Sequence, residues 1–200
     1  SITGCLNVAI GECAMGQVNT TGNNNIAIGR VSLDALTTGL CNIAIGDNAL
    51  GVSTTGCLNV AIGVTAMGIG VTTGQQNVAI GNATMDALLS GDYNIAIGQS
   101  AMNGVTTLQA DNNIAIGKSA LVGTSATAGD DNVAIGRRAL ITATTGAAQN
   151  TVVGSLAGEA IAAGDFNTAL GYNAGADVNS GTYNTTIGHS AGDNITTGSG

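Results

Sequence analysis

The stretch Asn94-Ile95-Ala96-Ile97-Gly98 decides the fold, because the same five-residue phrase recurs along the whole chain. Its asparagine occurs eleven times, at intervals of 17 to 19 residues. Self-similarity at a short, nearly fixed period is typical of stacked solenoid repeats rather than of one globular core. We therefore expect an all-β fold, a parallel β-solenoid (β-roll or β-helix) with one 17–19-residue coil for each asparagine. The eleven asparagines are Asn7, Asn25, Asn42, Asn59, Asn77, Asn94, Asn113, Asn132, Asn150, Asn167 and Asn184.

The composition favours a thin interior made of small side chains. Of 200 residues, 32 are glycine, proline and tryptophan are absent, and aromatic residues are 2%, whereas hydrophobic residues reach 44%. Charged residues are only 8%, which together with the periodic apolar positions argues against disorder. The net charge of −8, with four Lys and Arg in total, excludes a basic patch, so neither nucleic acid nor an anionic membrane is an expected partner. No apolar run approaches the roughly 20 residues of a membrane-spanning helix, so membrane insertion is not expected.

Alignment of the repeats on the asparagine places β-branched residues at the first and third following positions, with alanine between them. Alternate residues of a strand face the same side, so we predict that the β-branched residues point inward and the alanines outward. Restriction of an outward position to alanine indicates that another backbone approaches closely. That backbone is either a neighbouring chain in an oligomer or the far wall of the same coil. The alanines predicted as an oligomer contact are Ala9, Ala27, Ala44, Ala61, Ala79, Ala96, Ala115 and Ala134.

The other repeated residues are interpreted as structural. The asparagine side chains are expected to stack as an amide ladder along the axis, or to cap their own turns. Glycine ends every phrase, from Gly11 to Gly188, which indicates a backbone angle or a clearance that a Cβ would forbid. A second apolar segment in each repeat, such as Ala101-Met102, is predicted to form the opposing wall of the coil.

The last three repeats differ from the first eight. The β-branched apolar residue after the asparagine becomes Thr151, Thr168 or Thr185, and the second apolar segment loses its Leu or Met. We therefore predict two solenoid segments, residues 1–149 and 150–200, with a narrower interior in the second.

Catalytic chemistry is not expected, because the chain has one histidine, His189, in a variable position that we expect to be exposed. One column of residues is a candidate cation site: Asp92, Asp111 and Asp130 each lie two residues before a repeat asparagine in successive coils. Oxygen ligands of this kind suit Ca²⁺, and the alternative is a solvated acidic corner. No other cofactor is predicted.

Four cysteines, Cys5, Cys13, Cys41 and Cys57, lie in the first 57 residues without zinc-ligand spacing. Cys41 and Cys57 come from adjacent coils and are the only pair considered for a disulfide. The alternative is that all four are free thiols in small apolar positions.

Paired threonines stack over four repeats, at Thr20-Thr21, Thr37-Thr38, Thr54-Thr55 and Thr72-Thr73. Regular threonine arrays on flat solenoids can match an ice lattice, so an ice-binding surface is the alternative function. Adjacent threonines of a strand point to opposite faces, however, and the array ends after four rungs.

The repeat phrase resembles two known families. NVAIGVTAMG at 59–68 and NIAIGKSAL at 113–121 are similar to head repeats of trimeric autotransporter adhesins, and NTALGYNAG at 167–175 is similar to repeats of bacteriophage tail fibres. The resemblance implies a homotrimeric β-roll on a cell or virion surface, in an extracellular fibre that binds a host receptor or glycan. The period here is longer than in the adhesin heads, and no neck or coiled coil is present. The similar phase of the two ends also allows an end-to-end homopolymer, so the expected partner is the chain itself.

Overall fold

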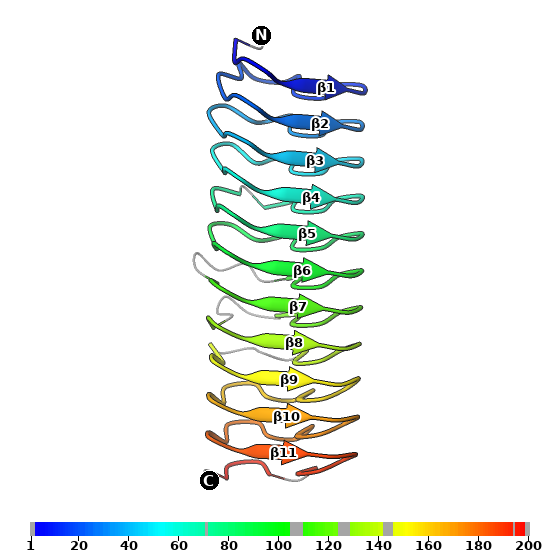
Figure 1. Ribbon diagram of the computed structural model, residues 1–200, viewed down its shortest axis with the longest axis vertical. Helices are drawn as coiled ribbons and strands as arrows, with labels where there is room; N and C mark the ends of the chain where they lie inside the picture. Colours follow the sequence, from blue (N-terminus) through cyan, green and yellow to red (C-terminus); the bar gives the residue numbers. More distant parts are fainter. Residues whose placement is uncertain are drawn as a thin grey trace.

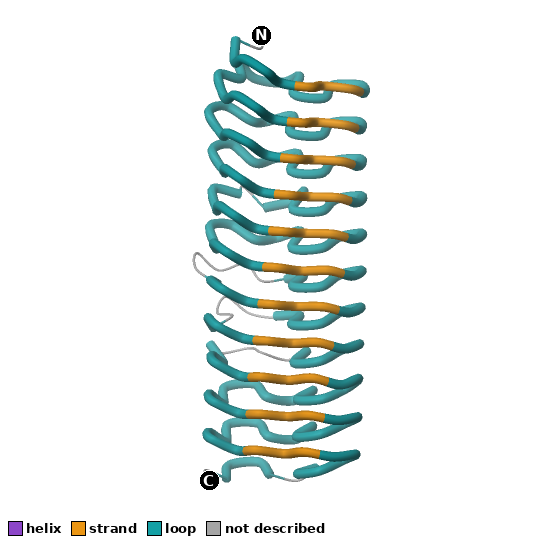
Figure 2. Tube along the Cα trace, in the orientation of Figure 1, coloured by secondary structure: helices purple, strands orange, loops and turns teal. Residues whose placement is uncertain are grey.

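The computed structural model is a parallel β-solenoid, described over residues 3–70, 72–104, 110–123, 129–141, 146–193 and 195–198. One strand from each coil enters a single eleven-stranded parallel sheet in sequence order, and the two termini lie at opposite ends of the stack (Figure 1). The described residues contain no helix, and outside the strands they form loops and turns (Figure 2). The predicted fold class is confirmed. The strands are β1 (Val8–Ile10), β2 (Ile26–Ile28), β3 (Ile43–Ile45), β4 (Val60–Ile62), β5 (Val78–Ile80), β6 (Ile95–Ile97), β7 (Ile114–Ile116), β8 (Val133–Ile135), β9 (Thr151–Val153), β10 (Thr168–Leu170) and β11 (Thr185–Ile187).

The strands pair in the register that the repeat phrase predicts. Ile95 lies beside Ile114 and Ala96 beside Ala115, so equivalent residues form straight columns along the axis. The sheet continues from β8 to β9 in the same register, with Val133 beside Thr151. The change of sequence at residue 150 therefore falls within one continuous sheet.

The asparagines preceding the strands form the predicted ladder. Asn94 donates its backbone N–H to Oδ1 of Asn77 at 2.9 Å and its side-chain Nδ2 to the same oxygen at 3.0 Å. Its own Oδ1 accepts the two equivalent bonds from Asn113, at 2.9 and 3.1 Å. The ladder amides are buried from Asn25 to Asn184, so these bonds satisfy polar groups that water does not reach.

The glycine that closes each phrase is required for both reasons that the sequence suggested. Gly98 has φ +130°, a conformation that L side chains rarely adopt, and a Cβ there would lie 2.7 Å from the carbonyl oxygen of Gly117 in the next coil. At this glycine the chain turns within one strand spacing of the equivalent glycine in the next coil. A side chain here would push the two coils apart.

The opposing wall is built of turns rather than of a second strand. In the β6 coil, Ser100 and Met102 have φ of 55° and 51°. Tyr93, just before the ladder asparagine, also has a positive φ, of 59°. Left-handed conformations cost roughly 1–2 kcal/mol for each residue other than glycine. Hydrogen bonds along the axis offset that cost: the N–H of Met102, for example, donates to the carbonyl of Ala120 at 2.9 Å.

The orientation predicted for the strands is wrong, because the alanines point inward and the β-branched residues outward. In the first eight coils the large buried side chains come from the opposing wall, such as Met102 or Leu121, with a second one at Leu36 and Leu88 in the β2 and β5 coils, and the strand contributes only a methyl group opposite them. The alanine column therefore contacts its own coil's far wall, which was the alternative explanation of its small size. Ala9 is exposed in the terminal β1 coil, and the remaining seven have no exposed surface: Ala27, Ala44, Ala61, Ala79, Ala96, Ala115 and Ala134.

The last three coils fill the same interior from different positions. Glycine replaces the large residue of the opposing wall, and a Cβ at Gly158 would lie 2.9 Å from Cδ1 of Ile161 and 3.1 Å from both methyl groups of Val152. Val152 occupies the strand position that alanine holds in β1 to β8 and in β10, and Ile161 follows on the next turn; both are fully buried. In the β9 coil part of the bulk has moved to the strand, whereas in the β10 coil Ala169 is kept and the buried Val178 of the next turn takes the position equivalent to Ile161.

Candidate functional surface: an apolar face bordered by two edges

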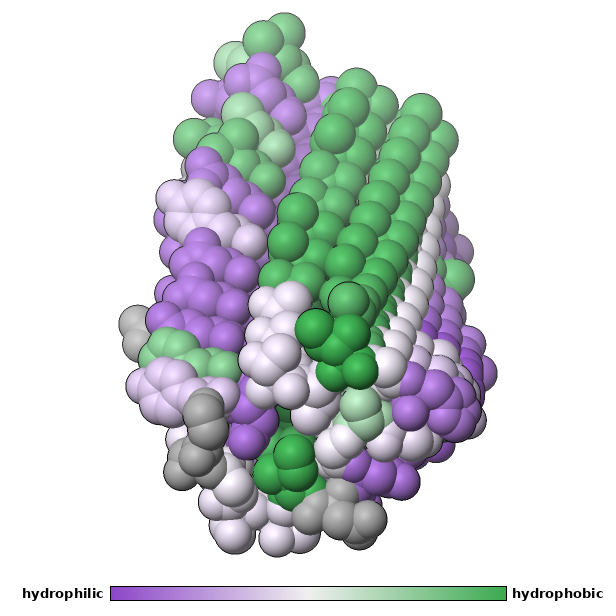
Figure 3. All heavy atoms as spheres, turned by 60° about the horizontal axis from the view of Figure 1, so that its bottom comes forward, coloured by the Kyte–Doolittle hydropathy of each residue, from purple (hydrophilic) through white to green (hydrophobic). Residues whose placement is uncertain are grey.

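The sheet presents its β-branched residues to solvent. We name these residues the apolar face; Ile95 and Ile97 are 36% and 37% exposed, although each is shielded by identical neighbours above and below. Figure 3 shows columns of apolar side chains along most of the stack, which give way to less hydrophobic residues toward the C-terminal end. The apolar face comprises Val8, Ile10, Ile26, Ile28, Ile43, Ile45, Val60, Ile62, Val78, Ile80, Ile95, Ile97, Ile114, Ile116, Val133 and Ile135.

The face becomes more polar in the last three coils. The outward position after the ladder asparagine is threonine in β9, β10 and β11, whereas the second outward position stays aliphatic, with Leu170 46% and Ile187 65% exposed. The two ends of the outward surface therefore differ in polarity, and this difference distinguishes the two directions along the solenoid axis.

The face is comparable in size to the largest apolar patch of a typical monomer. The eight strands β1 to β8 that carry it, at about 4.8 Å spacing, give a length of roughly 40 Å, and three residues give a width of about 10 Å. The projected area is thus about 400 Å², within the 300–600 Å² of the largest apolar patch on a typical monomer, which is often functional.

Two columns of side chains border this face. The entry edge consists of the residue just before each ladder asparagine: Leu6, Asn24, Cys41, Leu58, Gln76, Tyr93, Asn112, Asp131, Gln149, Phe166 and Tyr183. The exit edge consists of the residue just after each repeat glycine: Glu12, Arg30, Asp47, Val64, Asn82, Gln99, Lys118, Arg137, Ser155, Tyr172 and His189.

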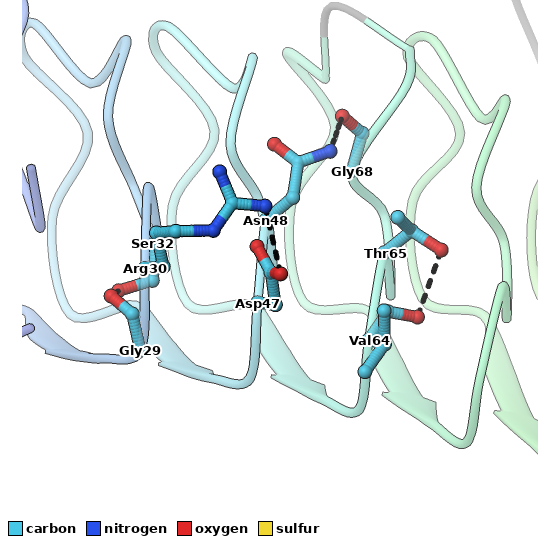
Figure 4. A network of polar contacts seen from close by, with 8 residues as sticks. All are labelled: Gly29, Arg30, Ser32, Asp47, Asn48, Val64, Thr65 and Gly68. Atoms are coloured by element: carbon cyan, nitrogen blue, oxygen red, sulfur yellow. Dashed lines mark hydrogen bonds and ion pairs between the residues drawn. The ribbon is translucent and has the colours of Figure 1, made fainter. Parts of the chain in front are cut away.

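Contacts within the chain run along each edge. Arg30 and Asp47 form an ion pair of 2.8 Å on the exit edge, and Val64 follows them in the next coil (Figure 4). The hydrogen bond to Asp47 and its negative charge raise the pKa of Arg30 above the usual arginine value. Near the C-terminal end, the rings of Phe166 and Tyr183 stack at 4.8 Å on the entry edge.

His189 lies on the exit edge, where the sequence placed it. Its ring stacks on Tyr172 with centroids 5.2 Å apart, and the side chain is exposed. The contact is an aromatic stack rather than a hydrogen bond between a nucleophile and a base, so the geometry offers no catalytic arrangement at this residue.

The acidic column has a structural use. Each carboxylate accepts a backbone N–H from the preceding coil: Asp92 from Gln75 at 2.7 Å, and Asp111 from Asp92 at 2.8 Å. Asp130 likewise accepts from Asp111 at 2.9 Å, and at the same position Sγ of Cys57 accepts the N–H of Leu40 at 3.3 Å. Over the described part of the chain no three metal-ligating side chains form a group, and calcium binding stays a prediction.

The cysteines are free. Cys5, Cys13 and Cys41 are exposed and Cys57 is partly buried, so the disulfide considered between Cys41 and Cys57 is not formed in this structure.

The paired threonines do not form a two-column array on the surface. Thr20 and Thr72 are fully buried and donate their hydroxyls to the carbonyls of Leu36 and Leu88, at 2.8 and 3.2 Å. Thr37 also donates inward along the axis, to the carbonyl of Thr54 at 2.8 Å. These hydroxyls satisfy the backbone at a corner of the coil.

The apolar face is the surface feature that the sequence interpretation missed. One signal for it was available: the only valine in the alanine column, Val152, occurs in a coil whose opposing wall has Gly158 in place of a Leu or Met. A size exchange between two positions indicates that both face the same interior.

No family model matches the chain, and neither the curated proteins nor the solved structures yield a similar one. The described residues include no helix that is long and apolar enough to cross a membrane.

Proposed function

We propose that this chain is a structural segment of an extracellular fibre and that it assembles with copies of itself through the apolar face. The observation that carries the proposal is the row of at least partly exposed Val and Ile that runs through the eight coils from β1 to β8, on a stack whose backbone bonds run along its axis. Burial of such a face removes apolar area from water, at about 25 cal/mol per Å².

The repeated polar groups support a mechanical role. Three groups of polar side chains form hydrogen bonds with neighbouring coils: the ladder asparagines, the acidic column and the inner threonines. The repeat therefore uses its polar side chains to keep the coils in register, and leaves its aliphatic side chains free for contact with another molecule. The extracellular location and an adhesive role rest on the resemblance of the repeat phrase to adhesin and tail-fibre repeats.

Lateral association is favoured over end-to-end stacking as the main contact. A lateral contact covers the whole apolar face, about 400 Å² in projection, whereas an end contact covers one coil and leaves that face exposed to water. A homotrimer of parallel chains is the lateral assembly that the resemblance suggests.

Light scattering coupled to size exclusion tests the assembly. The 19.3 kDa chain should elute as a multimer, and the double variant Ile95→Lys with Ile97→Lys should be monomeric with an unchanged circular dichroism spectrum. A matched control, Thr55→Lys, adds a charge at an exposed position away from the face and should leave the multimer intact. A monomeric wild-type chain at micromolar concentration would refute the proposal.

A further inference from the structure

A single asparagine of the chain is followed by glycine. Asn103 precedes Gly104, whereas every ladder asparagine precedes Val, Ile or Thr. A glycine has no Cβ to crowd its own backbone nitrogen, and a β-branched side chain crowds that nitrogen most. At Asn103-Gly104 the backbone nitrogen can therefore approach the side-chain amide of the preceding residue more easily than at any ladder asparagine.

This pair lies on the opposing wall of the β6 coil, directly after the buried Met102. Asn103 and Gly104 are both partly exposed, so water reaches them. The ladder asparagines from Asn25 to Asn184, by contrast, are buried. The amide of Asn103 thus meets both a backbone nitrogen that a side chain does not cover and the water that hydrolysis consumes.

The carboxylate of Asp86 contacts both reacting groups. Asp86 holds the position equivalent to Asn103 in the β5 coil, and its Oδ2 accepts a hydrogen bond from Nδ2 of Asn103 at 3.3 Å. The backbone N–H of Gly104 also donates to this carboxylate, as does that of Ala87. One carboxylate therefore lies within hydrogen-bond reach of the nitrogen of Gly104 and of the amide nitrogen of Asn103.

The surroundings of Asp86 suit a general base. The residue is 8% exposed, and burial raises the pKa of its carboxyl group above the usual value. A carboxylate with a raised pKa takes up a proton more readily than an exposed one does. The equivalent residues in the adjacent coils are Gly68 and Asn103, and neither carries a charge that would lower this pKa.

We propose that Asn103-Gly104 is a self-modification site, at which Asp86 promotes deamidation of Asn103 through a succinimide. Asp86 takes the proton from the nitrogen of Gly104, and this nitrogen forms a bond to Cγ of Asn103. The bond between Cγ and Nδ2 breaks, and Nδ2 leaves as ammonia with the proton that Asp86 returns. Water then opens the succinimide ring at either carbonyl and gives aspartate or isoaspartate. The net change is uptake of water and release of ammonia, and it is independent of the proposed self-association.

The product weakens the junction of the β5 and β6 coils. An aspartate at position 103 places its carboxylate against that of Asp86, and like charges repel strongly in a partly buried site. Isoaspartate also adds a methylene group to the main chain of a coil whose register depends on axial bonds, such as that from Met102 to Ala120 at 2.9 Å. Deamidation would therefore make this junction the first to open as the molecule ages.

Peptide mapping by mass spectrometry tests the reaction in the full, folded chain at neutral pH. Asn103 should deamidate faster than Asn179, an exposed asparagine that precedes Ser180. In Asp86→Asn, checked for folding by circular dichroism, deamidation of Asn103 should be at least about tenfold slower. In urea, which separates Asp86 from Gly104, wild type and variant should react at the same rate.

The dependence of the rate on pH separates a base from a residue that only orders the turn. In wild type the rate at Asn103 should rise as Asp86 ionises and then level off. In Asp86→Asn it should instead keep rising in proportion to hydroxide. If Asp86 acted only by stabilising the fold, the two profiles would have the same shape.

The variant Asn103→Asp tests the effect of the product. It should lower the melting temperature at pH 7 by about 2–4 °C, and the deficit should shrink toward pH 4, where the two carboxyl groups share a proton. Asn179→Asp is the matched control, because it adds the same charge at an exposed position and should change the melting temperature much less.

Either of two results would overturn the proposed modification. One is an equal rate at Asn103 in folded wild type and folded Asp86→Asn, and the other is a rate at Asn103 below that at Asn179. A monomeric wild-type chain would instead refute self-association and leave the modification site untouched, so the failures of the two proposals are distinguishable.

Discussion

A single ladder asparagine joins three coils. Asn94 bonds to Asn77 on one side and supplies the acceptor for both the backbone N–H and the side chain of Asn113 on the other. Its removal would leave a buried backbone N–H without an acceptor, and such an orphan group costs about 1–3 kcal/mol.

We therefore predict that Asn94→Ala lowers the free energy of unfolding by about 3 kcal/mol, since a buried acceptor and two donors are lost together. Chemical denaturation followed by circular dichroism measures the change. Asn82→Ala removes an exposed amide of the exit edge and is the control, with an expected change below about 0.5 kcal/mol.

The carboxylate of Asp86 is buried, and burial disfavours its charged form. Asp86 is 8% exposed, and burial raises the pKa of its side chain above the usual value, although hydrogen bonds from the backbone of Ala87 and Gly104 and from Asn103 oppose this shift. The folded state therefore binds a proton at Asp86 more tightly than the unfolded state does. The stabilisation from this proton is complete below the unfolded pKa, near 3.9, and is lost as the pH rises through the folded value.

Asp86→Asn should remove this contribution to the pH dependence. The variant should be more stable than wild type at pH 7 and should lose that advantage as the pH falls toward about 4. Urea titrations at several pH values measure the difference. An advantage of equal size at pH 4 and pH 7 would contradict the assignment to Asp86.

At the scale of the coil, packing depends on which position carries the large side chain that fills the interior. Val152 on the strand and Gly158 on the opposing wall together replace the alanine and the Leu or Met of the first eight coils. Leu140, at the position equivalent to Gly158 in the β8 coil, has nearly the same backbone, with φ 53° against 55°. The backbone of the β9 coil thus accepts a large side chain, provided that the interior has room for it.

We predict a compensating pair in the β9 coil. Gly158→Leu alone overfills the interior and Val152→Ala alone leaves a cavity, each at a cost of about 1–3 kcal/mol. The double variant should be more stable than the sum of the two changes allows, by about 1 kcal/mol or more. A double-mutant cycle by chemical denaturation measures this coupling, and strict additivity would show that the two side chains do not share a space.

The elements of the coil were predictable to different degrees. The period, the strands, the ladder from Asn7 onward and the need for Gly98 followed from repetition, because a residue required in every coil reports a local constraint of the backbone. The inward face of the strand did not follow. Alternation shows which side chains share a face, but larger residues were assumed to fill the core, whereas here Met102 from the other wall leaves space only for Ala96.

At the scale of the whole molecule, the same reversal changes the expected interface. The predicted oligomer contact was the alanine column, and seven of its eight residues are fully buried within the chain. The exposed aliphatic columns on either side of it take that place in the proposed assembly. The repeat pattern identifies the residues on each face of the strand. It does not show which face of a three-residue strand is turned to solvent.

Association through the apolar face predicts a melting temperature that depends on concentration. Binding that occurs only in the folded state stabilises it by mass action, so the midpoint of thermal unfolding should rise as the chain is concentrated. Differential scanning calorimetry over a hundredfold range measures the shift. The variant with Ile95→Lys and Ile97→Lys should melt at one temperature throughout that range.

The hydrogen bonds between coils point along the line that joins the two termini (Figure 1). A pull on the ends of a single molecule therefore acts on every rung in series, and the weakest rung opens first. Each opened rung releases 17 to 19 residues, about 60 Å of slack at roughly 3.3–3.6 Å per residue, before the next is loaded. An overstretched shaft would thus lengthen by discrete steps and absorb work at each one, while the remaining coils keep their shape.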